Sequence, residues 1–192
     1  MGVDPGLARC GVVVVDGDGR SAQLAAERLI RTSADQPVGQ RLAHVADTVA
    51  EMLTRWTPDV MAIERLLFNV NVRSAMIVAQ AVGVILLSAA RAGVAVVDYT
   101  PTEVKATVTG YGDADKAQVK FLIAAQLGRG GAARSADVAD AAAVALCHFW
   151  RNGAVGGASI GGHSSRLAAA VEQAGPGAQV VQPARPGRGG SA

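Results

Sequence analysis

The sequence lacks several features that would each indicate a particular class of protein. It contains two cysteines in 192 residues, Cys10 and Cys147, with no C-x-x-C pair, which argues against a disulfide scaffold and suits a reducing cytoplasm. No basic segment followed by a leader-like apolar run stands at the N-terminus, so no export signal is predicted. The phosphate-binding pattern G-x-x-x-x-G-K-[ST] is also missing. We therefore expect a cytoplasmic protein without a P-loop.

The longest apolar run, residues 74–90, is too short to indicate a membrane protein. It lies between Arg73 and Arg91 and contains Ser74, Gln80 and Ser88, whereas a spanning helix needs about 20 apolar residues. A helix buried in the domain or in a subunit interface is the better interpretation. We expect a soluble protein that has no membrane partner.

Charge and composition indicate a globular domain followed by a tail. The 18 basic and 16 acidic residues leave a formal charge of +2, which permits a nucleic-acid partner without requiring one. Half of the residues are hydrophobic, enough for one sizeable core. From residue 152 to residue 192 the chain is rich in Gly, Ala and Pro, and we expect this tail to be disordered.

The patterns along residues 1–151 predict an α/β fold. Apolar strands are expected around Asp4 and at 10–15, 21–31, 60–64 and 94–99, with a hairpin turn at 16–19. Helices are expected at 38–56, 73–91, from Pro101, from an Asp113 N-cap to Leu127, and from a Ser135 N-cap to Trp150. This order predicts a mixed five-stranded sheet with helices on both faces.

Four acidic residues stand where hydrophobic residues are expected. Asp4 and Glu64 end apolar strands, and Asp137 and Asp140 lie three residues apart on one face of a predicted helix. Each also has an ordinary interpretation, as a solvated strand end or as an acid in a first helical turn. If the strands of Asp4 and Glu64 lie side by side, their ends can meet. Oxygen-only clusters suit Mg²⁺ or Mn²⁺, and two such ions can promote phosphodiester hydrolysis.

Six motifs occur in the order and spacing of one known family. These are G-V-D-P-G, A-I-E, Q-A-V-G-V, P-T-E-V-K, D-K-A-Q-V and A-D-V-A-D-A, within residues 2–150. The chain resembles RuvC, the bacterial Holliday-junction resolvases. The resemblance implies a ribonuclease H-like nuclease domain over 1–151, a homodimer, and Mg²⁺-dependent paired nicks in four-way DNA that leave 5′-phosphates. It also implies that RuvA and RuvB are partners, and that two ions bind each subunit during catalysis. The family's four catalytic, metal-binding acids correspond to Asp4, Glu64, Asp137 and Asp140.

The same resemblance suggests residues that bind DNA. The family's two lysines correspond to Lys105 and Lys116, and Lys120 would extend their basic face. An aromatic residue that stacks on bases is expected three positions after the glutamate, where Leu67 stands, so the neighbouring Phe68 is the candidate. Arg73 and Arg65 are candidate phosphate contacts. By contrast, His148 lies about 16 Å along the helix from Asp137, and we predict a packing role for it.

One departure from the family pattern leaves two alternatives open. Only three residues precede Asp4, fewer than in typical RuvC chains, so either the true start lies upstream or the first strand is weak, and we expect the true start to lie upstream. A weak strand would favour a junction-binding protein that does not cleave. An ATP-binding protein of the actin and sugar-kinase type is a further alternative, because it also begins with an apolar strand, an acid and a glycine turn.

Overall fold

The computed structural model describes residues 1–17, 21–65, 72–110, 112–127 and 135–153. Its strands are β1 (Gly2–Asp4), β2 (Arg9–Gly17), β3 (Ala22–Arg31), β4 (Val60–Glu64) and β5 (Ala95–Tyr99). Its helices are α1 (Val38–Trp56), α2 (Val72–Arg91), α3 (Pro101–Thr109), α4 (Lys116–Leu127) and α5 (Ala136–Gly153). The predicted order of strands and helices is confirmed.

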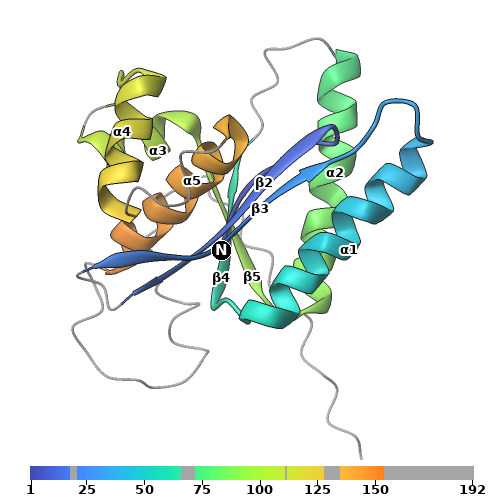
Figure 1. The fold of residues 1–192 in the computed structure, drawn as a ribbon, viewed down its shortest axis with the longest axis horizontal. Coiled ribbons are helices and arrows are strands. Elements are labelled where there is room, and N and C mark those ends of the chain that lie inside the picture. The colour runs from blue at the N-terminus through green and yellow to red at the C-terminus, as the bar shows by residue number, and fades with distance from the viewer. Residues whose placement is uncertain (18–20, 66–71, 111, 128–134, 154–192) are drawn as a thin grey trace, which may run out of the picture.

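The five strands form one mixed sheet in the order β3-β2-β1-β4-β5 (Figure 1). The first three strands make an antiparallel meander, as predicted, and β1 then pairs in parallel with β4, which pairs in parallel with β5. The three-residue β1 is therefore the central strand. The predicted mixed five-stranded sheet is confirmed.

Helices cover both faces of the sheet because successive side chains in a strand point to opposite faces. Val3 and Val12 point to one face, where they join a core with α1 and α2. Val13 and Ala62 point to the other face, where they pack with α3, α4 and α5. Figure 1 shows α1 and α2 on one side of the strands and α3, α4 and α5 on the other.

The boundaries differ from the prediction in a few places. The predicted cap of α4 at Asp113 is wrong: Asp115 caps this helix, because its Oδ1 accepts from the Gln118 backbone N–H at 2.8 Å while the Gln118 side chain accepts from the Asp115 N–H at 3.1 Å. The strand expected at 10–15 spans Arg9–Gly17, and α5 extends to Gly153. The centre of the turn at 16–19 and nearly all of the predicted tail lie outside the described residues. No helix in the described parts of the chain is long and apolar enough to cross a membrane.

Candidate active site

Asp4 and Glu64 occupy neighbouring positions at the ends of two parallel strands. The register pairs Gly2 with Ala62 and Val3 with Ile63, so Asp4 and Glu64 are the next residues of β1 and β4. Adjacent strands lie about 4.8 Å apart. Ala62 belongs to the core that contains α5, and residues two apart in a strand share a face. Both acids therefore lie on the α5 face of the sheet, and both are half-buried.

Helix α5 crosses β1 and β2 at two glycines that leave room for its backbone. A Cβ atom on Gly2 would stand 2.3 Å from the Ala141 carbonyl oxygen, and one on Gly11 would stand 2.0 Å from the Asp137 carbonyl oxygen. Gly11 is the cross-strand partner of Asp4. The first turn of α5 therefore lies over the residue that pairs with Asp4, which places the backbone of Asp137 close to the ends of β1 and β4.

The start of α5 follows the predicted local pattern. The Ser135 hydroxyl accepts a hydrogen bond from the Val138 backbone N–H at 3.2 Å, which caps the helix and confirms the predicted N-cap. Asp137 lies in the first turn, with 21% of its side chain exposed, and the half-buried Asp140 follows three residues later. The strand register and the crossing of α5 thus bring Asp4, Glu64 and the backbone of Asp137 to the same end of β1 and β4, and Asp140 follows about one helical turn later.

A basic residue that the sequence analysis missed lies beside these acids. The Arg9 guanidinium donates from Nε to Asp137 Oδ2 at 2.9 Å, and its Nη2 lies 2.7 Å from the same oxygen. Arg9 begins β2, two residues before Gly11, so it lies on the same face of the sheet. No local pattern in the sequence indicates this pairing, because Arg9 and Asp137 are 128 residues apart.

The negative charge of the site affects a neighbouring thiol. Burial, together with the nearby carboxylates of Asp4 and Asp137, raises the pKa of Cys10 to about 12. Cys10 is fully buried in the core with α1 and α2, and it is a free cysteine. This thiol therefore stays protonated at neutral pH and is no candidate for a nucleophile or a metal ligand.

The donor set fits a hard cation, although the side chains are not gathered around one. All four candidate ligands are carboxylates, which Mg²⁺ and Mn²⁺ prefer. Among the residues that the structure describes, no three Asp, Glu, His or Cys side chains form a group that could hold a metal ion. The backbone thus brings Asp4, Glu64 and Asp137 to the same end of the sheet, while Asp137 Oδ2 forms an ion pair with Arg9.

A polar network ties the C-terminal half of α5 to β5 and α3. Tyr99 is the strand partner of Glu64, and its hydroxyl is 2.8 Å from His148 Nδ1 on α5. The Arg151 guanidinium lies 3.4 Å from Glu103 Oε1 on α3. Burial acts to raise the pKa of Glu103, but hydrogen bonds from Thr100 and the charge of Arg151 hold this pKa below its ordinary value. These contacts brace the helix that carries Asp137 and Asp140, and they place His148 in the packing role that we predicted.

The candidate DNA-binding residues divide into described and undescribed groups. Lys105 is half-buried on α3, and Lys120 is exposed on α4. Arg65 pairs with the Asp98 carboxylate on β5, which gives it a structural contact. The side chains of the other candidates lie outside the described residues, namely Lys116, Phe68, Leu67 and Arg73.

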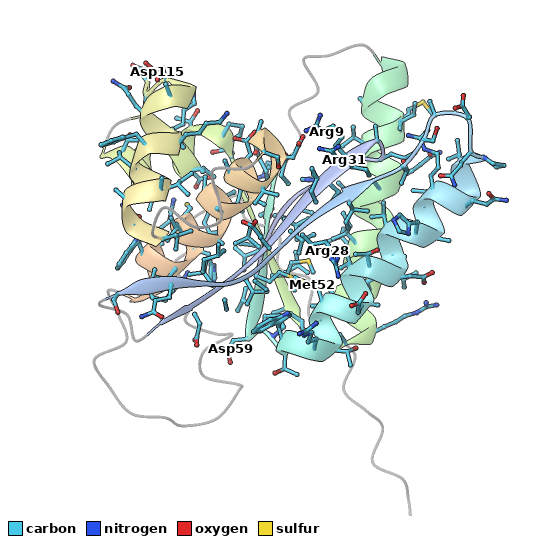
Figure 2. All side chains as sticks on the ribbon, viewed as in Figure 1. Arg9, Arg28, Arg31, Met52, Asp59 and Asp115 are labelled. Atoms are coloured by element: carbon cyan, nitrogen blue, oxygen red, sulfur yellow. The ribbon has the colours of Figure 1, made fainter. Side chains whose placement is uncertain are left out.

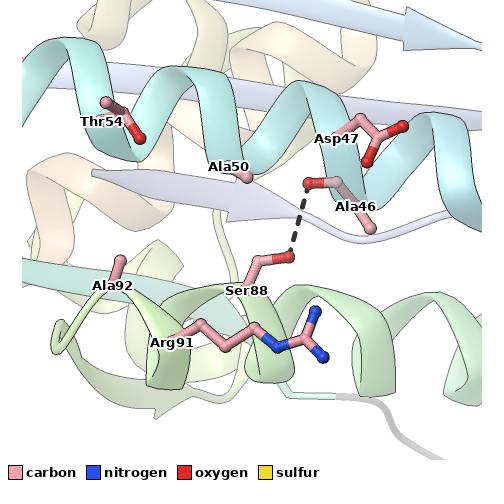
Figure 3. Close-up of a pocket in the computed structure, with 7 residues that line it drawn as sticks. All are labelled: Ala46, Asp47, Ala50, Thr54, Ser88, Arg91 and Ala92. Atoms are coloured by element: carbon pink, nitrogen blue, oxygen red, sulfur yellow. Dashed lines mark hydrogen bonds between the residues drawn. The ribbon is translucent and has the colours of Figure 1, made fainter.

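A cavity elsewhere in the molecule does not coincide with the acids. It lies between α1 and α2 and is lined by Ala46, Asp47, Ala50, Thr54, Ser88, Arg91 and Ala92 (Figure 3). The Ser88 hydroxyl on α2 donates a hydrogen bond to the Ala46 carbonyl oxygen on α1, at 3.4 Å. Because α1 and α2 pack on the face opposite to α5, this cavity is separated from the four acids by the sheet.

Comparison with known proteins identifies the family. The model of the family described as "Crossover junction endodeoxyribonuclease RuvC" matches residues 1–148. This chain belongs to the RuvC family. The family member from Salinispora arenicola is 46% identical over 175 residues, which cover 91% of this chain and 95% of the relative. The member from Leifsonia xyli subsp. xyli is 49% identical over 154 residues, covering 80% and 74%.

The fold comparison agrees with this assignment. The structure described as "T. thermophilus RuvC in complex with Holliday junction substrate" matches with a TM-score of 0.75 and 35% identity, covering 78% of this chain and 91% of that chain. The predicted RuvC resemblance and the ribonuclease H-like fold are thereby confirmed. RuvC-like resolvases are nucleases that use divalent metal ions, which agrees with the all-carboxylate donor set of this chain.

Proposed function

We propose that this protein is a structure-specific endonuclease that resolves four-way DNA junctions by paired, symmetric nicks during recombination and repair. The proposal rests on the positions of three acids. Asp4 and Glu64 lie at neighbouring positions on two parallel strands, and the helix that packs over β1 carries Asp137 in its first turn. Membership of the family of crossover junction endodeoxyribonucleases supports it. The actin-like ATP-binding alternative and the non-cleaving alternative receive no support from the relatives.

In this proposal, Asp4, Glu64, Asp137 and Asp140 are the catalytic residues and hold the metal. Mg²⁺ is the expected ion and Mn²⁺ a substitute, with two ions per subunit during catalysis. Ions held by these carboxylates would promote the attack of water and would stabilise the leaving oxygen of a phosphodiester. The carboxylates orient the attack so that the products carry 5′-phosphate and 3′-hydroxyl ends. Lys105, Lys116 and Lys120 bind backbone phosphates, Arg73 adds a further phosphate contact, and Phe68 stacks on bases at the crossover.

Two symmetric nicks need two sites, and α2 offers a surface for a second copy. Met76 and Leu87 are 61% and 49% exposed on this helix. They are eleven residues apart, about three turns, and therefore share a face with the exposed Gly83 between them. We propose that this face forms the homodimer interface. The variant Leu87→Glu should run as a monomer in light scattering, whereas Thr54→Glu on α1 should leave the dimer intact. A Leu87→Glu dimer of wild-type stability would contradict this assignment.

The wider setting follows from the family. We propose that the protein acts in the cytoplasm together with a branch-migration complex of RuvA and RuvB. Two free, buried cysteines suit this reducing compartment. We further propose that residues 1–151 are the nuclease domain and that the Gly-, Ala- and Pro-rich segment 152–192 is a disordered tail.

Substitution of the acids tests the proposal directly. Asp4→Asn and Asp140→Asn should each lower Mg²⁺-dependent cleavage of a synthetic four-way junction by about a hundredfold or more, because each removes an anionic ligand. Binding of the junction, measured in a gel-shift assay, should persist. Asp47→Asn on the opposite side of the molecule is the matched control, because Asp47 is an exposed acid on α1. Full cleavage by both site variants would refute the proposal.

A further inference from the structure

The ion pair between Arg9 and Asp137 joins a proposed metal ligand to an exposed cation. Both Arg9 contacts, at 2.9 and 2.7 Å, fall on the same oxygen, Asp137 Oδ2. The Arg9 side chain is 51% exposed, whereas that of Asp137 is 21% exposed. The guanidinium therefore approaches the carboxylate from the solvent side, and it can leave without opening the core.

A second arginine lies directly opposite the first. Arg9 and Arg31 are cross-strand partners on β2 and β3, so their side chains project from the same face of the sheet. Both are exposed, and Figure 2 shows them at the neighbouring ends of the two strands. Like charges in such a pair repel each other, which favours an anion between or beside them. The phosphate backbone of a DNA strand is an anion of this kind.

The Asp137 carboxylate cannot bind the Arg9 guanidinium and a divalent cation at full strength at the same time. A metal ion bound by this carboxylate places two positive charges next to the Arg9 guanidinium, and the like charges repel. As the side chains stand, no three potential ligands are grouped among the described residues. Formation of the metal site therefore requires that side chains move, and release of the Arg9 contact would free Asp137 Oδ2 for the cation.

We propose that Arg9 is a displaceable counter-ion of Asp137. In the metal-free protein it neutralises this carboxylate. When a divalent cation binds, Arg9 leaves Asp137 and, with Arg31, contacts a phosphate of the DNA strand that enters the site. This inference rests on the proposed metal site and assigns a positioning role to a residue outside the four acids.

The release of Arg9 from Asp137 couples the binding of the cation to the binding of the DNA phosphate. A cation that releases Arg9 makes phosphate binding more favourable, and by thermodynamic linkage a phosphate that captures Arg9 raises the affinity for the cation by the same factor. The metal site would then be weakly filled in free protein and well filled on DNA. Because of this coupling, the metal-dependent cleavage activity would be confined to protein that is bound to DNA.

Metal binding without DNA provides the first test, with a readout that is independent of activity. The dissociation constant of Mn²⁺ is measured by electron paramagnetic resonance of free Mn²⁺ for the wild type, Arg9→Gln, Arg9→Lys and Arg31→Gln. Arg9→Gln should bind Mn²⁺ about three- to tenfold more tightly, because a competing ion pair and a nearby positive charge are lost. Arg9→Lys and Arg31→Gln should stay within about twofold of the wild type, since each keeps a cation next to Asp137.

Junction binding provides the second test. Affinity is measured with and without Ca²⁺, on junctions whose strands are checked to be intact after the experiment. Both Arg9→Gln and Arg31→Gln should weaken binding, but only Arg9→Gln should reduce the factor by which Ca²⁺ strengthens it. Unchanged or weaker Mn²⁺ binding by Arg9→Gln, with a lower melting temperature, would overturn the inference and make Arg9 a structural tie between β2 and α5. A wild-type protein that binds no Mn²⁺ either alone or together with junction DNA would refute the proposed metal site as well, so the two failures can be told apart.

Discussion

Gly11→Ala should damage the site without touching any of its acids. The new Cβ atom would stand 2.0 Å from the Asp137 carbonyl oxygen, 2.5 Å from its carbonyl carbon and 3.0 Å from the Val138 nitrogen. All three are backbone atoms, so no side chain can rotate away. An ordinary contact of 3.4 Å requires the first turn of α5 to retreat from β2 by about 1.4 Å.

That displacement has a measurable effect on both activity and stability. A misplacement of about 1 Å in a catalytic group can lower the rate about a hundredfold, so we expect a loss of this order in junction cleavage. Overpacking of this kind costs about 1–3 kcal/mol of unfolding free energy, which lowers the melting temperature by roughly 3–10 °C. Junction binding should fall much less than cleavage, because the exposed cations remain.

Gly39→Ala is the matched control for this variant. A Cβ atom on Gly39 meets nothing within 4 Å, and the residue lies in α1. The same substitution should therefore preserve cleavage and raise stability slightly, by up to about 1 kcal/mol. If Gly11→Ala cleaves at the wild-type rate with an unchanged melting temperature, then close contact with Gly11 does not position Asp137, and the reasoning fails.

Two further predictions concern stability. Thr57 ends α1 in the left-handed region at φ 40°, where a β-branched residue is strained, so Thr57→Gly should raise the melting temperature by about 2–3 °C in calorimetry while Thr54→Gly inside the helix lowers it. Burial lowers the pKa of His148 from its ordinary value of 6.5 to about 4, so the folded state binds fewer protons than the unfolded state between these values. The unfolding free energy in urea should accordingly fall by up to about 3 kcal/mol between pH 6.5 and pH 4, and this loss should be much smaller in His148→Gln. Parallel pH profiles for the two proteins would contradict this assignment.

Much of the fold follows from local patterns in the sequence. The apolar run ending on Glu64 predicts β4 to the residue, and the helical spacing of residues 38–56 predicts α1 to the residue. The cap of α4 was placed wrongly because Asp113 and Asp115 both precede the helix. The reciprocal hydrogen bonds between Asp115 and Gln118 decide between them, and the capping-box spacing is visible in the sequence.

The candidate site was harder to predict. Alternation and strand pairing place Asp4 beside Glu64, but they say nothing about which helix lies above them. The decisive information is the contact between Gly11 and Asp137, two residues separated by most of the domain. The pairing of Arg9 with Asp137 was missed for the same reason, since nothing in a local window links the two residues. Long-range packing, which sequence patterns do not contain, assembles the site.

The crossing of α5 over β1 also has a consequence for biosynthesis. Asp4 leaves the ribosome at the start of translation, whereas α5 is the last described element of the chain. The pairing of β1 with β4 and the docking of α5 both close long loops, which are slow steps in folding. A nascent chain therefore carries an incomplete set of acids until α5 has emerged and docked. If the four acids hold the metal as proposed, a chain still on the ribosome cannot cleave a junction before α5, which carries Asp137 and Asp140, has been made.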